Sequence, residues 1–154
     1  MHKYAAHVVW TRQTAEKFID NRYSRAHEWA FDGGVTVKAS SSPSVVPLPL
    51  SAADAVDPEE ALVASASSCH MLYFLFFAAK KGFVIDRYDD EAFGVLEKNE
   101  AGKMFMKTIT LRPKLTFSGD KTPTPDELHA LHHSAHEECF IATSLKSEIV
   151  IESR

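Results

Sequence analysis

Cysteine is scarce in this chain, with two among 154 residues. Two thiols cannot build the dense disulfide framework of a small secreted domain. The N-terminus, Met1-His2-Lys3-Tyr4, also has no apolar core of the kind that a secretory signal contains. We therefore expect a reducing, cytoplasmic setting, in which the thiols stay reduced unless they cycle.

Clustered positive charge is missing as well. The formal net charge is −4, and the sequence has no cluster of lysine and arginine residues. Neither nucleic acid nor an anionic membrane surface is therefore an expected partner. The composition, 45% hydrophobic and 25% charged, is ordinary for a soluble globular protein. The length predicts one domain spanning residues 1–154.

The longest uncharged run of the chain is residues 61–79. It is about as long as a membrane-spanning helix. Its centre, however, contains Ser65, Ser67, Ser68, Cys69 and His70. This polar centre favours a helix that is buried on nearly all sides of a soluble protein, and not a membrane span.

The hydrophobic pattern predicts an α+β fold in which antiparallel sheets pack on a long central helix. Alternating apolar residues predict strands within residues 3–38, and Asp32-Gly33-Gly34 supplies a tight turn between two of them. Residues 39–56 contain three prolines, so we expect a long loop there.

The central helix is expected over residues 57–81. Asp57 can cap its start, Pro58 suits the first helical position, and Gly82 provides a left-handed stop. A helix so long and so apolar needs cover on all sides, and a second copy of the chain could supply that cover.

The remaining residues are expected to form strands and a second helix. Strands are expected within residues 83–117, around a hairpin turn at 99–102, and a last strand at 147–152. A capping box at 124–127 predicts the helix, over residues 125–143. Four side chains would share its core-facing side if the helix continues that far: Leu128, Leu131, Ala135 and Cys139.

Cys69 lies within the central helix, beside Ser67, Ser68 and His70. A free cysteine is often simply a small buried side chain. Hydrogen-bonding neighbours can also turn a thiol into a nucleophile. The residues alone leave both interpretations open. A Cys–His hydrolase is a weaker alternative, because neighbours on a helix point about 100° apart and His70 is therefore poorly placed as a base.

Cys139, like Cys69, is either a small buried side chain or a reactive thiol, and its neighbours add a third interpretation, a zinc ligand. His132, His136 and Cys139 follow i, i+4, i+7 spacing, which on a continuous helix would place three zinc ligands on one face. The chain has no C-x-x-C pair, however, and His-rich acidic helices are usually just solvated.

Four charged residues near these motifs are candidates for a site: Arg22, Arg25, Glu59 and Glu60. Solvated surface is the ordinary role of such residues. Glu59 and Glu60 are also explained by the first turn of the helix, where the helix dipole favours negative charge. Composition and spacing alone do not assign these residues to a site.

Three stretches carry a resemblance to a known family. Residues 56–70 open with Asp-Pro-Glu and place Cys69 ten residues after Glu59. Residues 135–144 form a His-rich segment that ends in a cysteine and a small polar patch. Residues 23–34 are similar to the N-terminal strands of the same family. Together they resemble the OsmC/Ohr proteins, which are thiol peroxidases of organic hydroperoxides. The similarity covers nearly the whole chain.

The resemblance implies an OsmC-like fold and an intertwined homodimer with active sites at the subunit interface. Cys69 would be the peroxidatic thiolate that becomes a sulfenic acid, and Cys139 would resolve it as a disulfide. Arg25 would favour the thiolate and orient the peroxide, and Glu59 would hold Arg25. An external dithiol, in the family often lipoyl-linked, would regenerate the enzyme. No metal, haem or flavin is needed.

Residues around Cys69 would suit a bulky apolar peroxide: Met71, Phe74 and Phe77. Two positions depart from the family pattern. Phe140 stands where many members have proline after the second cysteine, and Ala26 where an acidic residue often follows the family arginine. Arg22 therefore remains a rival to Arg25.

Two alternatives to a peroxidase stay open at this point. The first is a catalytically silent binding or structural dimer that shares the fold. The second is a zinc-binding protein that uses His132, His136 and Cys139.

Overall fold

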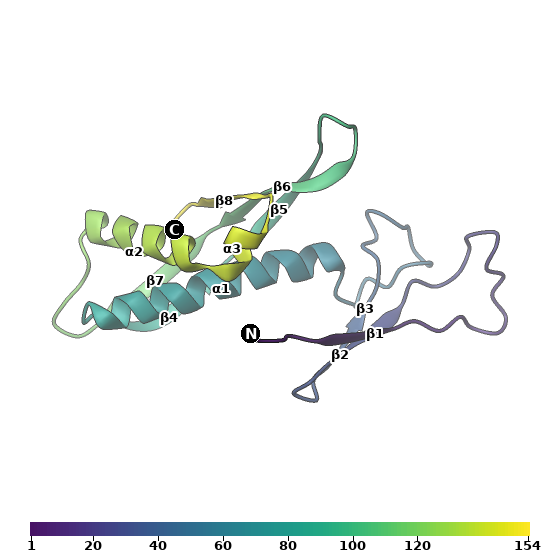
Figure 1. The fold of residues 1–154 in the computed structure, drawn as a ribbon, viewed down its shortest axis with the longest axis horizontal. Coiled ribbons are helices and arrows are strands. Elements are labelled where there is room, and N and C mark those ends of the chain that lie inside the picture. Colours follow the sequence, from purple (N-terminus) through teal and green to yellow (C-terminus); the bar gives the residue numbers. More distant parts are fainter. The chain divides into compact units, whose positions relative to one another are not determined.

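A computed structural model describes the whole chain, Met1 to Arg154. The chain forms two compact units, Met1–Ala61 and Leu62–Arg154. Strands and helices share the chain, with several sheets and a long helix, which confirms the α+β class (Figure 1). The expectation of a single domain stays a prediction.

The first unit contains one antiparallel sheet in the order β1-β2-β3. Its strands are β1 (Ala6–Val9), β2 (His27–Phe31) and β3 (Thr36–Ala39). Gly34 lies in the turn between β2 and β3 with a φ of 81°, a conformation that glycine adopts at little cost. No helix or further strand follows until residue 58, so the proline-containing segment is the expected loop.

The helix expected over residues 57–81 is α1, Pro58–Lys80. At its start the Glu60 N–H donates to Asp57 Oδ1 (2.8 Å), and the Asp57 N–H donates to Glu60 Oε2 (3.2 Å). This reciprocal pair is a capping box. At its end Gly82 has a φ of 78°, and the Phe83 N–H donates to the Ala78 carbonyl (3.0 Å). Such a left-handed glycine stop is a common helix ending.

Two sheets lie in the second unit. One pairs β4 (Val84–Asp90) with β7 (Pro113–Ser118), and the other has the order β5-β6-β8. Its strands are β5 (Phe93–Lys98), β6 (Met104–Leu111) and β8 (Glu148–Ile151). β8 runs parallel to β6, whereas the sequence led us to expect antiparallel sheets only. The two helices between β7 and β8 form a long crossover, which allows the last strand to run in the same direction as β6.

The helix expected over residues 125–143 is broken at Cys139. α2 spans Pro125–Glu138 and α3 spans Phe140–Ser144, with Cys139 between them in an extended conformation (φ −69°, ψ 108°). The Cys139 Sγ accepts a hydrogen bond from the Ala142 N–H (3.3 Å) and so caps α3. Because a new helix starts here, Cys139 does not continue the helical spacing of α2.

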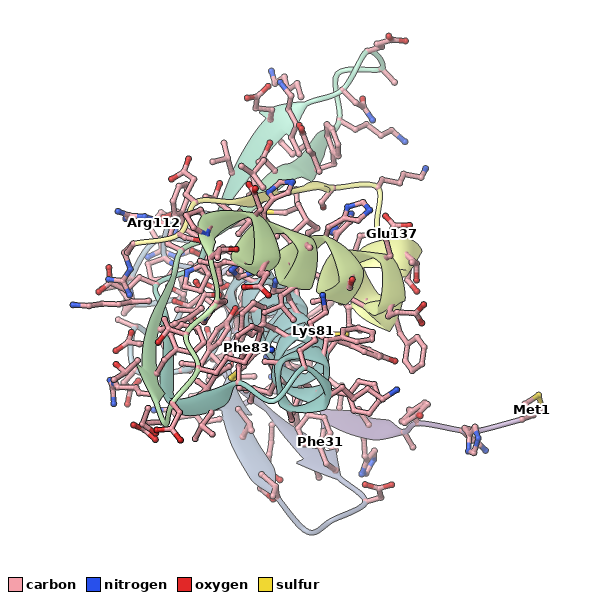
Figure 2. The ribbon with its side chains drawn as sticks, turned by 90° about the vertical axis from the view of Figure 1, so that its left-hand side faces the viewer. Met1, Phe31, Lys81, Phe83, Arg112 and Glu137 are labelled. Carbon is pink, nitrogen blue, oxygen red and sulfur yellow. The ribbon has the colours of Figure 1, made fainter.

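The core of the second unit consists of two clusters that share α1. The C-terminal half of α1 packs on α2 and on the β4–β7 pair through Phe74, Ala78, Phe83, Leu131 and Ala135. In Figure 2, α1 is seen nearly end-on with Phe83 beside it. Its N-terminal half packs on β6, β8 and α3 through Ala66, Met106, Ile109 and Leu111.

Burial on α1 is confined to one stripe: Ala66, His70, Phe74 and Ala78. Its other faces include large exposed side chains, among them Leu72 and Phe76. The expectation of a helix buried on nearly all sides is therefore wrong for the isolated chain. α1 is long and apolar enough to cross a membrane by length and composition, a property that core helices of soluble proteins share.

Candidate functional site

The fold brings the two cysteines together, although they are far apart in the sequence. Cys69 is half-buried on α1, and Cys139 lies between α2 and α3 with 1% of its surface exposed. Both are free thiols. Burial, followed by a hydrogen bond with Cys69, raises the pKa of the Cys139 thiol from 9.0 to about 11. Cys139 is therefore a protonated thiol at neutral pH.

A pocket of about 570 Å³ opens beside Cys69. One wall is a single face of α1, with side chains one turn apart along the helix. The other wall is the start of α3. The pocket is lined by Ser65, Ser68, Cys69, Leu72, Tyr73, Phe76, Phe140 and Ile141. Cys139 does not line it, so a ligand in the pocket meets the Cys69 thiol and not the Cys139 thiol.

The structure corrects the expected substrate contacts. Met71, Phe74 and Phe77 do not line the pocket. Phe74 is fully buried and packs in the core against α2. The physical reason is helical periodicity, because residues three, four and seven positions after Cys69 share its face. That spacing predicts Leu72, Tyr73 and Phe76, and it could have been applied to the sequence alone.

Arg25 and Glu59 both belong to the first unit. The Arg25 guanidinium donates to the Asn21 carbonyl (3.0 Å), to Asn21 Oδ1 (2.9 Å) and to the Tyr23 carbonyl. It also lies 3.9 Å from the centroid of the Tyr23 ring. Glu59 is half-buried in the first turn of α1 and forms no ion pair with Arg25. Their joint role at Cys69 stays a prediction.

Arg22, the rival to Arg25, is exposed, and its backbone N–H donates to Asp20 Oδ1 (3.1 Å). None of the hydrogen bonds or ion pairs of the structure involves its guanidinium. Of the two arginines, Arg25 alone has a side chain held in a defined position. This difference favours Arg25 as the residue to test first.

Sequence reasoning missed a buried histidine pair. His70 Nε2 and His132 Nδ1 lie 3.0 Å apart, and the two rings are stacked with centroids 5.3 Å apart. Burial and the neighbouring His132 lower the pKa of His70 from 6.5 to about 4. Burial and the neighbouring His129 lower the pKa of His132 to about 4 as well. Both imidazoles are therefore neutral at neutral pH.

The predicted zinc set does not form. The structure contains no group of three or more His, Cys, Asp or Glu side chains that could hold a metal ion. His132 instead bonds to His70. The i+7 relation to Cys139 is lost because α2 ends at Glu138. His70, bonded to His132, is also not available as a base for Cys69.

The chain resembles OsmC-like proteins in sequence and structure. The family model for OsmC-like protein matches residues 51–154. An OsmC-like protein of unknown function from Vibrio cholerae is 51% identical, with a TM-score of 0.98 and 100% of both chains covered.

More distant solved structures share the fold alone. The organic hydroperoxide resistance protein OhrB of Bacillus subtilis is 18% identical, with a TM-score of 0.65 and 98% of each chain covered. An organic hydroperoxide resistance protein from Elizabethkingia anophelis is 15% identical, with a TM-score of 0.68 and coverage of 99% of this chain and 94% of that one. No curated protein matches the chain. By its family match and by its likeness to the Vibrio cholerae structure, the chain belongs to the OsmC-like protein family.

Proposed function

We propose that the protein is a thiol peroxidase that reduces organic hydroperoxides to alcohols. The observation that carries the proposal is the pair of neighbouring free thiols, one of which lines an apolar pocket. Membership of the OsmC-like family and a fold shared with organic hydroperoxide resistance proteins support it.

Cys69 takes the first step because its thiol alone faces the pocket. The Cys69 thiolate attacks the terminal oxygen of the O–O bond, which breaks, and the departing alkoxide takes up a proton. The products are an alcohol and the sulfenic acid of Cys69. The sulfur loses two electrons, and the peroxide gains them.

Cys139 takes the second step. As a buried thiol in contact with Cys69, it attacks the sulfenic sulfur, its proton leaves with the hydroxyl as water, and a disulfide forms. An external dithiol, such as a lipoyl-linked one, then reduces the disulfide by thiol exchange. The disulfide thereby returns to two thiols, and the reductant leaves oxidised.

The proposal includes Arg25 as the cation that favours the Cys69 thiolate and orients the peroxide, with Glu59 holding the guanidinium. It also includes a homodimer. Exposed apolar residues in the second unit support the homodimer, since they need cover that the isolated chain does not provide. They lie on β5 and include Phe93, Val95 and Leu96.

The test is turnover of tert-butyl hydroperoxide with dihydrolipoamide as reductant. We expect turnover by the natural sequence, none by Cys69→Ser, and one stalled equivalent in Cys139→Ser, trapped as a dimedone adduct on Cys69. Ser44→Ala, at an exposed position that does not line the pocket, is the matched control. Full turnover by Cys69→Ser would contradict the proposal. Thiols that remain unlinked after oxidation, seen by non-reducing mass spectrometry, would favour the catalytically silent dimer.

A further inference from the structure

Two of the aromatic rings that line the pocket meet edge to face. The ring centroids of Tyr73 and Phe140 lie 5.6 Å apart, with an angle of 81° between the planes. Tyr73 follows Cys69 by one turn of α1, and Phe140 follows Cys139 directly. The aromatic pair and the thiol pair are therefore positioned by the same two segments of the fold.

The pocket changes character along α1. Ser65 and Ser68 lie on the N-terminal side of Cys69, and Leu72, Tyr73 and Phe76 lie on its C-terminal side. At the usual helical rise, Phe76 lies about 10 Å beyond Cys69 along the axis. That length suits a six-membered ring with a short branch. A hydroperoxide with its O–O bond at Cys69 would thus extend its carbon substituent among the rings.

Phe140 has no evident role in the core. Its side chain is 66% exposed. Its backbone is nevertheless held, because its carbonyl accepts hydrogen bonds from Thr143 Oγ1 (3.1 Å) and Ser144 Oγ (2.6 Å). An exposed ring on a fixed backbone beside a pocket gains burial when an apolar ligand enters.

We infer that Tyr73 and Phe140 make the pocket selective for hydroperoxides whose substituent is a planar aromatic ring, with Phe140 as a specificity-determining residue. The inference rests on the proposed peroxidase function. Aromatic rings in contact gain about two- to tenfold in affinity beyond what buried area alone provides. A saturated ring of the same carbon number gains only the burial.

The experiment compares three substrates. Cumene hydroperoxide carries a phenyl ring, 2-cyclohexylpropan-2-yl hydroperoxide is its saturated counterpart, and tert-butyl hydroperoxide has no ring. We expect the natural sequence to have a kcat/KM about two- to tenfold higher for cumene hydroperoxide than for the saturated counterpart. Phe140→Leu and Tyr73→Leu should each bring that ratio close to one.

Two further variants serve as controls. Phe140→Pro also removes the ring, and proline suits the first position of a helix, which Phe140 occupies in α3. This variant therefore tests the ring if the leucine variant misfolds. Phe31→Leu removes an exposed ring on β2 that does not line the pocket, and it should leave the ratio unchanged. A ratio near one in the natural sequence, or one that loss of the Phe140 ring does not lower, would overturn the inference.

A binding measurement separates this inference from the proposed function. Absence of turnover with all three hydroperoxides would count against the peroxidase alone. Affinities of Cys69→Ser for 2-phenylpropan-2-ol and 2-cyclohexylpropan-2-ol, from NMR titration, then decide the selectivity. Tighter binding of the aromatic alcohol, lost in the Phe140→Leu background, supports the inference, and equal binding overturns it.

Discussion

His70 and His132 form a hydrogen bond of 3.0 Å between two imidazoles that are 1% and 5% exposed. It links α1, one residue after Cys69, to α2, two turns before Cys139. A shared proton between neutral rings satisfies Nε2 of one and Nδ1 of the other. Protonation of both rings would place two positive charges in the core, which ties the stability of this region to pH.

Lowering the pH from 6.5 toward 4 should therefore destabilise the second unit. The pKa of both imidazoles is about 4 in the folded chain and 6.5 in the unfolded one, so the unfolded chain binds more protons between these values. Their stabilisation is complete above pH 6.5 and is lost as the pH falls toward 4. We expect a loss of about 3 kcal/mol per imidazole at most, measured by urea unfolding at successive pH values.

The double variant His70→Gln with His132→Gln should flatten this dependence, whereas His133→Gln, at an exposed position, should keep it. A free energy of unfolding that stays constant from pH 6.5 to 4.5 in the natural sequence would refute the assignment.

The two thiols should differ in alkylation. Cys139 has a pKa of about 11, and only its thiolate reacts with iodoacetamide. Below pH 9 it should react about 100-fold more slowly than a free thiol, and more slowly still because it is buried. Cys69, which lines the pocket, should be labelled first. Mass spectrometry of peptides after timed labelling measures both rates.

Cys69→Ala tests the cause of this difference, since it removes one of the contributions that raise the pKa of Cys139. Labelling of Cys139 should then reach its midpoint at a lower pH. An unchanged midpoint would mean that burial alone sets the pKa.

Arg25→Ala should slow the reaction of Cys69 with peroxide by about 100-fold, because a positioned cation stabilises both the thiolate and the developing charge on oxygen. Stopped-flow measurement of the first oxidation, with tert-butyl hydroperoxide in excess, reads this step alone. Arg22→Ala is the matched control and should react at the natural rate. A larger effect of Arg22→Ala would transfer the role to that residue.

Arg154 should anchor the C-terminus after β8. Its guanidinium pairs with Asp89 (3.2 Å) and Glu91 (2.7 Å) and donates to the Arg112 carbonyl (2.8 Å), and its side chain is 22% exposed. Arg154→Ala should lower the free energy of unfolding by about 1–2 kcal/mol in urea. Arg87→Ala, which removes a 70% exposed partner of Asp89, should cost less than about 0.5 kcal/mol. Equal losses in the two variants would count against an anchoring role.

Local signals located the helices well. Asp57, Pro58 and Gly82 mark the ends of α1, and the capping box at Thr124 marks the start of α2, because these residues act through their own backbone neighbours. The family resemblance pointed to the thiol pair, whose contact no local pattern could show.

Features that depend on distant contacts were not predictable in the same way. The break at Cys139 follows from its side chain capping α3, and the parallel pairing of β8 follows from the path of the crossover. The His70–His132 pair needs the packing of two helices, which sequence spacing within either one does not reveal. Helical periodicity alone would have predicted the pocket lining, but the sequence reasoning assigned it to Met71, Phe74 and Phe77, which lie off the face of α1 that contains Cys69.

The hydrogen bond from the Ala142 N–H to the Cys139 sulfur makes the chemical shift of this amide proton depend on the oxidation state of Cys139. When that sulfur changes from a thiol to half of a disulfide, its electron density changes. The resonance of the amide proton that donates to it then shifts. A single backbone resonance could thus follow each turnover in the unmodified protein, without a label on either cysteine.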